Sequence, residues 1–368
     1  MTQRASPDVR DAGPAGAWRG FMSAFAITAA SCAAAFWLLV VWLDPYGLRT
    51  GPGRPPTPIM DLNQRFMYPQ LARSGRFDAA VFGTSTIRLL DPTTLDRLFG
   101  ARFANLGLNA GTPWEQMQLA RLFLRHVPRP KTVIFGLDST WCEADADTPG
   151  KRLTFRAFPE WLYDEDDTGD VLHVFTARAL EIAARVALHR LDLMPERIRG
   201  DGYEVFVPPE VRYDLGRARA HLWGPGRVGD EAVATSAEGA LASDAAPTSF
   251  PALRWLDDVL GDLPAGTNVM LVFPPVHIAA QPAPGSSAAT RDQACKDEVA
   301  ALGRRRGAAV VDFRLPSEVT TSDANYWDRL HFRVGIAARF ASALKVAHDT
   351  ARGDDGGFYR VLSAPAPQ

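Results

Sequence analysis

The sequence has little of what nucleic-acid-binding proteins, zinc proteins and disulfide scaffolds require. Its 40 lysine and arginine residues are outnumbered by 42 aspartate and glutamate residues, giving a formal net charge of −2. No basic stripe is interleaved with aromatic residues, so we expect no nucleic-acid partner. The three cysteines, Cys32, Cys142 and Cys295, are far apart and can form at most one bridge, between Cys142 and Cys295. This spacing is not that of a thiolate zinc site or a disulfide framework.

Motifs for nucleotides and metals are also missing. The sequence has no P-loop, no dinucleotide fingerprint and no His-rich zinc motif. The acidic run at residues 164–170 superficially has the pattern of a calcium loop, but Phe175 stands at the twelfth position, where such a loop has a bidentate glutamate. We interpret the run as a solvated acidic turn and expect neither a metal nor a cofactor.

One apolar segment stands out in a chain that is otherwise of ordinary globular composition. The 368 residues are 46% hydrophobic and 22% charged, which is enough to build one main domain. Residues 21–43 form an uncharged apolar run long enough to cross a bilayer as a helix. Trp18 precedes the run, and Trp37 and Trp42 lie near its far end, where aromatic residues favour the membrane interface. We expect a transmembrane anchor over residues 18–44.

The charges that flank this run predict its orientation. Arg4, Arg10 and Arg19 precede it, diluted by two aspartates, and Asp44 follows it at once. The positive-inside rule then predicts a cytoplasmic tail over residues 1–17. We expect a single-pass protein of the inner (cytoplasmic) membrane whose body lies on the extracytoplasmic, periplasmic side.

A cleaved signal peptide is the alternative interpretation of the same run. Residues 33–35 are all alanine and look like a small-residue cleavage site. Cleavage there would leave the strongly apolar residues 36–43 as an exposed terminus. An uncleaved anchor is therefore the preferred interpretation.

The body of the chain shows the pattern of an α/β fold. Five apolar runs that lack clean alternation predict strands covered on both faces, at residues 78–82, 103–106, 132–136, 268–273 and 308–313. Asp91 and Pro92 open a helix that stops at Gly100, and Thr112 begins a capping box for a helix through about residue 125. Strands separated by helices predict a three-layer α/β/α sandwich with a mostly parallel, five-stranded sheet.

The remaining segments complete the predicted domain organisation. Residues 45–76 are rich in proline and glycine at their start and predict a juxtamembrane spacer. The main domain covers residues 77–348, with an insert over about 143–265 and a C-terminal tail over 349–368. The insert contains an amphipathic helical pattern at about 176–193 and a low-complexity, flexible loop at about 229–249.

Three side chains combine into a candidate catalytic set. Ser85 follows the first strand, and Asp328 and His331 follow the last, so the sheet can bring them to one edge. An imidazole activates a serine hydroxyl, and a carboxylate fixes the imidazole tautomer. Taken singly, Ser85 also fits a turn that caps a helix, and Asp328 also fits a helix cap. Their chain order favours catalysis, but no Gly-x-Ser-x-Gly elbow surrounds Ser85, which argues against an ordinary α/β-hydrolase.

Four segments carry a family resemblance. Gly83-Thr84-Ser85, the 105–111 loop (Asn-Leu-Gly-Leu-Asn-Ala-Gly), Gly136-Leu137-Asp138 and Asp328-x-x-His331 resemble, in this order, the four blocks of the SGNH hydrolase superfamily. The resemblance spans about residues 77–344. The anchor, followed by Asp-Pro-Tyr-Gly at 44–47, further resembles the membrane-anchored SGNH-like proteins of bacterial envelope polysaccharide O-acetylation, including the alginate acetylation proteins.

The resemblance implies a role for each matching residue. Ser85 would be the nucleophile, His331 the general base and then acid, and Asp328 the residue that orients it. The oxyanion donors would be the Ser85 amide, a backbone N–H at Ala110 or Gly111, and the side chain at position 138.

Two positions depart from the family pattern. Thr84 replaces the usual aspartate, which the chemistry tolerates because that side chain is not the nucleophile. Asp138 replaces the usual asparagine, and an ionised aspartate accepts hydrogen bonds but cannot donate one to an oxyanion. Asn109 could take over the donor role, or Asp138 could simply cap a helix or turn after the third strand.

Four further residues have two interpretations each. His277 follows the fourth strand and could line the site, although we expect a solvent-facing loop histidine. Arg333 could hold an anionic sugar or pair with a neighbouring carboxylate. Trp114 and Trp141 could stack on sugar rings, although packing in the core is the simpler expectation.

These observations predict an acyl-transfer enzyme that acts on carbohydrate esters. We expect an O-acetyltransferase or acetylesterase whose partners are a carbohydrate polymer and an acyl donor, for example a membrane-bound O-acyltransferase partner. The alternative is a non-catalytic envelope scaffold that binds polysaccharide or partner proteins, which Asp138 favours and the intact Ser85, Asp328 and His331 set disfavours.

Overall fold

One mixed sheet forms the centre of the protein. The computed structural model describes residues 14–51, 53–224 and 249–365. Within them, the sheet strands are β1 Ala79–Phe82, β2 Phe103–Asn105, β3 Thr132–Gly136, β4 Asn268–Phe273, β5 Ala309–Asp312 and β6 Arg360–Ser363. Their order is β2-β1-β3-β4-β5-β6; the first five are parallel and β6 runs antiparallel to β5. All five predicted strands are therefore confirmed, in an α/β fold with a mostly parallel sheet.

The sixth strand corrects the prediction that residues 349–368 are a tail. β6 pairs with β5, so Val361 lies opposite Val311 and Arg360 opposite Asp312. The strand has four residues, and only Ser363 among them is fully buried. A short edge strand of this kind does not need an apolar run, because backbone hydrogen bonds to the neighbouring strand hold it in place. The sequence therefore contained no local signal for it.

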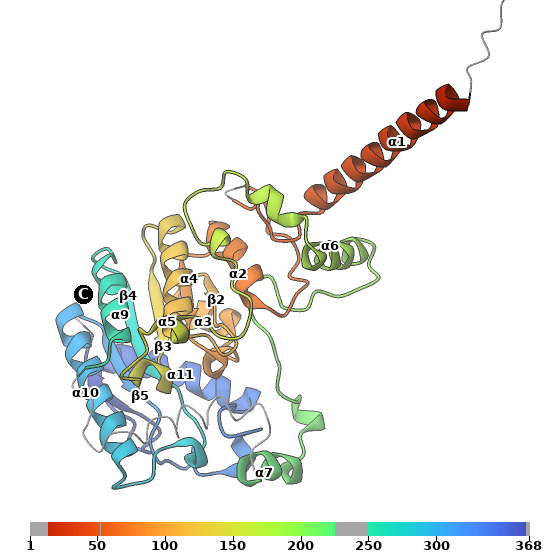
Figure 1. Ribbon diagram of the computed structural model, residues 1–368. Helices are drawn as coiled ribbons and strands as arrows, with labels where there is room; N and C mark the ends of the chain where they lie inside the picture. Colours follow the sequence, from red (N-terminus) through yellow and green to blue (C-terminus); the bar gives the residue numbers. More distant parts are fainter. Residues whose placement is uncertain (1–13, 52, 225–248, 366–368) are drawn as a thin grey trace, which may run out of the picture.

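Helices connect the strands, and Figure 1 shows their arrangement. The described α-helices are α1 Pro14–Leu43, α2 Gln64–Arg73, α3 Pro92–Phe99, α4 Pro113–His126, α5 Pro149–Arg152, α6 Ala177–Arg190, α7 Leu215–Trp223, α9 Ala252–Gly261, α10 Ser287–Arg306 and α11 Val334–Thr350. The predicted caps are confirmed. Asp91 accepts a hydrogen bond from the Thr93 amide, and Gly100 ends α3 at a φ of 63°. Thr112 and Glu115 form a reciprocal capping box at the start of α4.

Apolar side chains cover both faces of the sheet. Ala80 and Phe82 of β1 belong to one buried cluster, with residues of α2, α4, α9 and α10. Ala79 and Val81 of the same strand belong to a second cluster, with residues of α3 and α11. Successive side chains of a strand point to opposite faces, so burial on both explains why the strands lack alternation in the sequence.

Two predicted segments need correction. Residues 45–76 are not a spacer throughout, because Tyr46, Met67 and Tyr68 are fully buried and α2 packs against α4. Within the predicted insert, the amphipathic helix is confirmed as α6, whereas α9 packs against α4 and α10 and so belongs to the layer that covers the sheet. The predicted loop at about 229–249 lies almost entirely outside the described residues.

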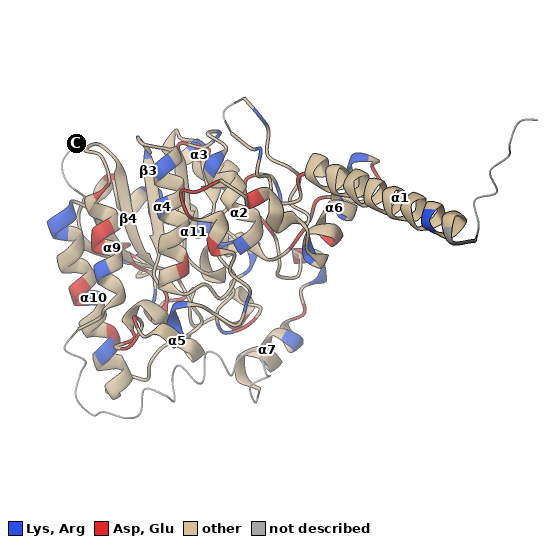
Figure 2. Cartoon of the chain, turned by 45° about the horizontal axis from the view of Figure 1, so that its top comes forward, with Lys and Arg blue, Asp and Glu red and all other residues tan. Residues whose placement is uncertain are grey.

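The first helix projects from the body. α1 has a mean hydropathy of 2.2 in its most apolar window and is long and apolar enough to span a membrane. Figure 1 shows it standing away from the sheet, and Figure 2 shows it almost free of charged residues.

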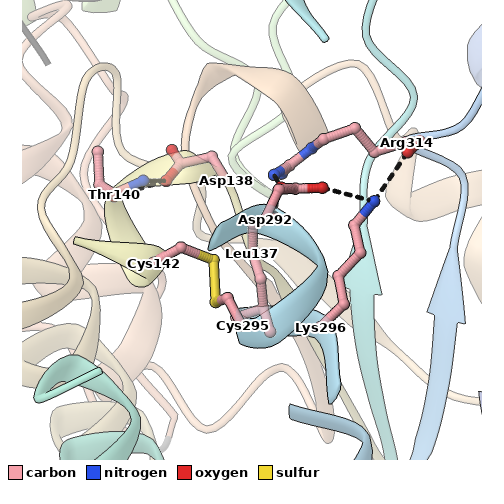
Figure 3. The surroundings of a disulfide bond; sticks show 8 residues. All are labelled: Leu137, Asp138, Thr140, Cys142, Asp292, Cys295, Lys296 and Arg314. Atoms are coloured by element: carbon pink, nitrogen blue, oxygen red, sulfur yellow. Dashed lines mark hydrogen bonds and ion pairs between the residues drawn. A yellow bond between two sulfur atoms is a disulfide. The ribbon is translucent and has the colours of Figure 1, made fainter. Parts of the chain in front are cut away.

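A disulfide joins two elements on one side of the sheet. Cys142 ends the 3-10 helix η2, Ser139–Cys142, and Cys295 lies in α10. This is the one bridge that the sequence permits. Next to it, Lys296 lies 2.9 Å from Asp292 and donates to the Arg314 carbonyl, while the Arg314 guanidinium donates to the Leu137 carbonyl (Figure 3). The disulfide and these contacts hold the segment that follows β3 against α10.

Candidate active site

Ser85, His331 and Asp328 form a continuous hydrogen-bonded chain. His331 Nε2 lies 2.8 Å from Ser85 Oγ, and His331 Nδ1 lies 2.7 Å from Asp328 Oδ2. All three side chains are partly exposed, so a substrate can reach them. In this geometry the ring can accept the serine proton at Nε2 while the carboxylate holds the proton on Nδ1.

The loop around Asp328 curls as its spacing predicts. Asp328 Oδ1 accepts hydrogen bonds from the amides of Leu330 and His331, each at 2.9 Å. Burial alone would raise the pKa of Asp328, but the His331 ring and these two amides outweigh burial and hold the pKa below its ordinary value. The carboxylate therefore stays ionised at neutral pH, as its orienting role requires.

Close packing behind Ser85 explains the glycine two positions before it. Ser85 opens the 3-10 helix η1, Ser85–Ile87, directly after β1. Gly83 has a φ of 155°, and a Cβ there would stand 2.7 Å from the Ile87 side chain and 3.0 Å from the Gly136 carbonyl. A larger residue would push η1 away from β3, so Gly83 lets the chain turn sharply enough to present Ser85 at the sheet edge.

Asn105 supports η1 from the neighbouring strand. Its side-chain amide, fully buried, donates to the carbonyls of Ile87, Arg88 and Leu90 at 2.9–3.2 Å. Its side-chain oxygen accepts from the Gly107 amide at 3.1 Å. One residue at the end of β2 thus fixes both the turn that carries Ser85 and the loop that follows β2. The sequence pattern included Asn105 but did not indicate this role.

A fully buried ion pair holds that same loop from the other side. The side chains of Arg65 and Glu115 are both 0% exposed, with Arg65 Nε 3.0 Å from Glu115 Oε1. Arg65 also donates to the carbonyls of Asn109 and Ala110, at 3.1 and 3.3 Å. Because the two carbonyls point at the guanidinium, the conformation of this turn is set by a residue of α2. No local pattern in the sequence indicates the pair, since its members are fifty positions apart.

The expected backbone oxyanion donors differ in their availability. The Ser85 amide begins η1 and so has no acceptor within that helix. Gly111 does not fit the role, because its amide donates to the Leu108 carbonyl at 3.1 Å. Ala110 is exposed and adopts a left-handed conformation with a φ of 49°. The amide of Asn109 makes a long contact of 3.4 Å with Gln64 Oε1. The Ser85 amide is the best placed of these donors.

Asp138 acts as a helix cap. Its Oδ1 accepts hydrogen bonds from the amide and the hydroxyl of Thr140, at 3.0 and 2.5 Å, and so caps η2. The capping interpretation therefore holds. In these contacts the carboxylate only accepts hydrogen bonds, so it offers no donor to an oxyanion.

A pocket of about 390 Å³ opens beside His331. It is lined by His331 and Asp328 and, among others, by Gln64, Arg88, Asn109, Arg156, Glu204, Phe206 and Trp327. Phe206 contacts the His331 ring edge-on, with the ring centres 5.1 Å apart, and the Arg88 guanidinium lies 4.8 Å over Phe206. The predicted residue Asn109 is thus at the pocket, together with several residues that the sequence did not indicate.

Two arginines, Arg88 and Arg156, line this pocket in what we call the cationic wall, and Glu204, which also lines the pocket, offsets the charge of Arg88. Arg88 is buried and pairs with Glu204, while Arg156 is half-buried. The Nε atoms of both are buried and have no hydrogen-bond partner among the described residues. Burial, followed by the nearby charges of Arg65 and Arg88, lowers the pKa of Arg156. Arg156 is half-buried, lines the pocket and has no ion-pair partner among the described residues, so its guanidinium is the charge that an anionic group could pair with.

The prediction that His277 faces solvent is wrong. The residue is 0% exposed and lies between the rings of Trp223 and Tyr326, each 5.3 Å away. Its Nε2 is 3.3 Å from Asp323, and its Nδ1 accepts from the Ala279 amide. Burial is the main cause that lowers the pKa of His277, and it outweighs the opposing effect of Asp323. The loop after β4 is covered by α7, which lies far away in the sequence.

The other proposed substrate contacts lie away from the pocket lining. Trp141 is 0% exposed in the core, so it cannot stack on a sugar. Trp114 is half-buried and packs edge-on against Phe158. Arg333 pairs with Glu210 and lies 3.9 Å over the Tyr213 ring. This is pairing with a neighbouring carboxylate, the alternative to holding an anionic sugar. In the part of the chain that the structure describes, no cluster of three or more histidine, cysteine or acidic side chains could hold a metal ion.

Comparison with known proteins adds no assignment. No protein-family model matches the chain, and no curated protein matches it.

Proposed function

We propose that this chain is a serine-dependent acyl-transfer enzyme of the SGNH type. The observation that carries the proposal is the hydrogen-bonded chain from Ser85 through His331 to Asp328. His331 Nε2 takes the proton as Ser85 Oγ attacks the acyl carbonyl carbon, and the tetrahedral intermediate collapses as His331 gives that proton to the departing oxygen. The acyl group is then an ester of Ser85. A sugar hydroxyl or water attacks it next, and its proton returns through His331 to Ser85 Oγ.

The architecture supports the SGNH assignment. The order of the five parallel strands, 2-1-3-4-5, is that of flavodoxin-like sheets, in which sites form where the order reverses, between β1 and β3. Ser85 follows β1 at this point. Apolar clusters on both faces of the sheet support a three-layer α/β/α arrangement. The nucleophile near the start and the Asp-x-x-His pair near the end complete the similarity.

The oxyanion site of the proposed enzyme lacks the side-chain donor that SGNH hydrolases usually have at the position of Asp138. With Asp138 committed to capping η2, the donors are the Ser85 amide and a backbone amide at Asn109 or Ala110. Loss of one preorganised donor costs about 3 kcal/mol, or roughly a hundredfold in rate. We therefore expect a slow enzyme.

The location of the enzyme belongs to the same proposal. α1 would cross the inner membrane once and place the body in the periplasm. The disulfide between Cys142 and Cys295 supports this side, because such bonds persist in oxidising compartments. The acceptor would be an envelope polysaccharide or exopolysaccharide, and the acyl donor would come from a membrane-bound O-acyltransferase partner or another activated ester.

The experiment uses the purified full chain in detergent with a chromogenic acetyl ester. The wild-type protein releases acetate and Ser85→Ala does not, whereas the control Ser342→Ala, on the exposed face of α11, keeps the wild-type rate. Mass spectrometry after rapid quenching finds an acetyl group on the peptide that contains Ser85. Equal activity of Ser85→Ala and wild type would remove the nucleophile from the proposal.

The cationic wall narrows the substrate class. Arg156 is expected to bind an anionic group of the donor or acceptor, since it lines the pocket, is half-buried and forms no ion pair among the described residues. Arg156→Ala should raise KM roughly tenfold or more for an acetyl ester that carries a carboxylate, which is the size of a charge-assisted hydrogen bond. For a neutral ester KM should stay within a factor of two. An equal change for both esters would argue against this role, and Arg339→Ala is the surface control.

A second candidate function is a non-catalytic polysaccharide-binding scaffold. The capping role of Asp138 favours it, because the residue that usually donates to the oxyanion is engaged elsewhere. A scaffold would bind polymer without releasing acetate, and polymer binding would be unaffected by Ser85→Ala. Retention of the chain on immobilised polymer, measured beside the ester assay, separates the two functions.

A further inference from the structure

Exposed apolar side chains are concentrated between residues 172 and 193. Leu172, Phe175, Leu188, Leu191 and Leu193 are 37–70% exposed. Leu172 lies in the 3-10 helix η4, Asp170–Val174, and Phe175 follows it; Leu188 lies in the last turn of α6, and the other two follow that helix. We call these five residues the apolar face. Large apolar groups gathered in this way mark an interaction surface.

The apolar face lies beside the end of α1. The Arg190 guanidinium is 4.7 Å over the Trp42 ring and donates to the Leu43 carbonyl at 3.3 Å. At the other end of α6, Thr176 Oγ1 lies 3.5 Å from the Tyr46 hydroxyl. Both η4 and α6 contact α1, and Figure 1 shows α6 at the base of the projecting helix. Each member of the face is therefore close in sequence to a residue that touches the end of α1.

The length of exposed helix places the membrane surface at this level. Every residue of α1 from Gly16 to Phe36 is exposed, whereas Val40 and Leu43 are buried against the body. Arg19 is the last charged residue before the apolar run, and at 1.5 Å per residue the uncharged part of the helix, residues 21–43, is about 34 Å long, which matches the hydrocarbon core of a bilayer with Cys32 at its centre. The body then begins where the hydrocarbon ends. No length of α1 is left over to lift the apolar face into water.

The polar residues around the apolar face also suit an interface. Trp42 is 57% exposed at the end of α1, in the position that aromatic belts occupy. Arg190 lies over its ring, and Arg49, with its side chain 48% exposed, donates to its carbonyl. Long cationic side chains at this depth reach phosphate headgroups while their stems stay among apolar groups.

We propose that the apolar face inserts into the headgroup and acyl-chain boundary of the same bilayer that α1 crosses. The body is then docked on the membrane in one orientation, instead of being held away from the membrane by a spacer. The occupant of the face is lipid, because the face continues the surface of the membrane helix. The inference rests on the membrane-anchor part of the proposed function and is independent of acyl transfer.

The test measures how deep single fluorescent labels lie in the bilayer. The full chain is reconstituted in phosphatidylcholine and phosphatidylglycerol vesicles without other proteins. Cys142 and Cys295 are joined, which leaves Cys32 in α1 as the free cysteine of the sequence. An environment-sensitive fluorophore on Cys32 reports the anchor. In a Cys32→Ala background, Leu191→Cys and, separately, Leu193→Cys report the apolar face. Val346→Cys on α11, 51% exposed, is the matched control. Nitroxide lipids quench the labels.

The expected result is strong quenching of the Cys32 label by deep nitroxides. Labels at positions 191 and 193 should be quenched by shallow nitroxides at least threefold more than the label at 346. Quenching at 191 and 193 equal to that at 346, with Cys32 quenched, would overturn the inference and leave the anchor intact. An unquenched Cys32 label would overturn the anchor and the inference together. Ester hydrolysis, measured on the same vesicles, reports the acyl-transfer proposal separately.

Discussion

Ser85 and His331 are 246 positions apart in the sequence, yet their Oγ and Nε2 atoms are separated by 2.8 Å. The contact joins the turn after β1 to the loop that precedes α11. Parallel strands end at one edge of the sheet, which is why segments from opposite ends of the domain meet there. A further contact ties the loops of this edge together, as the His277 amide donates to the Arg329 carbonyl at 2.9 Å.

Asp328→Asn tests the tautomer that the proposed mechanism requires of His331. The asparagine oxygen can keep both hydrogen bonds from the amides of Leu330 and His331, but its NH₂ group would face His331 Nδ1. The ring must then carry its proton on Nε2 and cannot accept the serine proton. We expect kcat to fall on the order of 10⁴-fold, with KM and the thermal midpoint almost unchanged. Steady-state kinetics measures this, and a loss of less than tenfold would exclude the orienting role.

Replacing one member of the Arg65–Glu115 pair should lower the free energy of unfolding more than replacing both members. Arg65→Met leaves the Glu115 carboxylate buried without its partner, and we expect the free energy of unfolding to drop by about 3–5 kcal/mol. The double variant Arg65→Met/Glu115→Met should recover much of this loss in a denaturant titration. Its ester hydrolysis should stay low, because the Asn109 and Ala110 carbonyls lose their donor.

The control for this cycle is a surface ion pair. Lys345→Ala breaks the contact with Asp349, one turn away on α11, and should change stability by less than about 1 kcal/mol. The cycle also needs the single variant Glu115→Met, and a double variant whose loss of stability equals the sum of the two single losses would show that Arg65 and Glu115 are not coupled.

The disulfide should contribute strongly to stability. Cys142 and Cys295 are 153 positions apart, and closing a loop of that length is worth roughly 5 kcal/mol in the chain-entropy model. We expect Cys142→Ser/Cys295→Ser, or treatment with reductant, to lower the thermal midpoint by several degrees. Cys32→Ser should have no such effect. An unchanged midpoint after reduction, with free thiols detected by labelling, would contradict the prediction.

His277 predicts a loss of stability in mild acid. Its pKa in the folded protein is lowered below the ordinary value of 6.5, so the unfolded chain binds a proton first as the pH falls. Stability from the neutral, buried ring is therefore fully present above about pH 6.5 and declines as the pH falls from there towards the lowered folded pKa. Asp323 and Arg329 are the charged groups that face it.

The measurement compares wild type with His277→Gln, which cannot titrate. Thermal midpoints between pH 7.5 and 5 should decline less steeply in the variant than in wild type. The comparison uses the slope, so a constant destabilisation from the substitution does not affect it. Parallel slopes would show that another group causes the acid sensitivity.

Local features of the sequence predicted much of the fold. The five parallel strands are continuous apolar runs, and the caps of α3 and α4 are set by residues within a single turn. The Asp-x-x-His spacing also operates over one turn, so the carboxylate contact followed from it. α1 was evident from its length and lack of charge. In each case the residues that produce the feature are neighbours in the chain.

Other features depended on contacts between distant segments. β6 exists because β5 offers it an edge, and His277 is buried because α7 covers it. The Asn109 and Ala110 carbonyls are held by Arg65, more than forty positions away in the sequence.

By itself, the sequence determined the five parallel strands, the helix caps, the long apolar helix and the Asp-x-x-His pair, because each is encoded in residues that are adjacent or one turn apart. The tertiary structure alone decided the Arg65–Glu115 pair, the cationic wall of Arg88 and Arg156, and the apolar face beside α1. These arise where distant segments are pressed together, and the free energy of burying a charge or leaving an apolar group exposed depends on neighbours that no local pattern specifies.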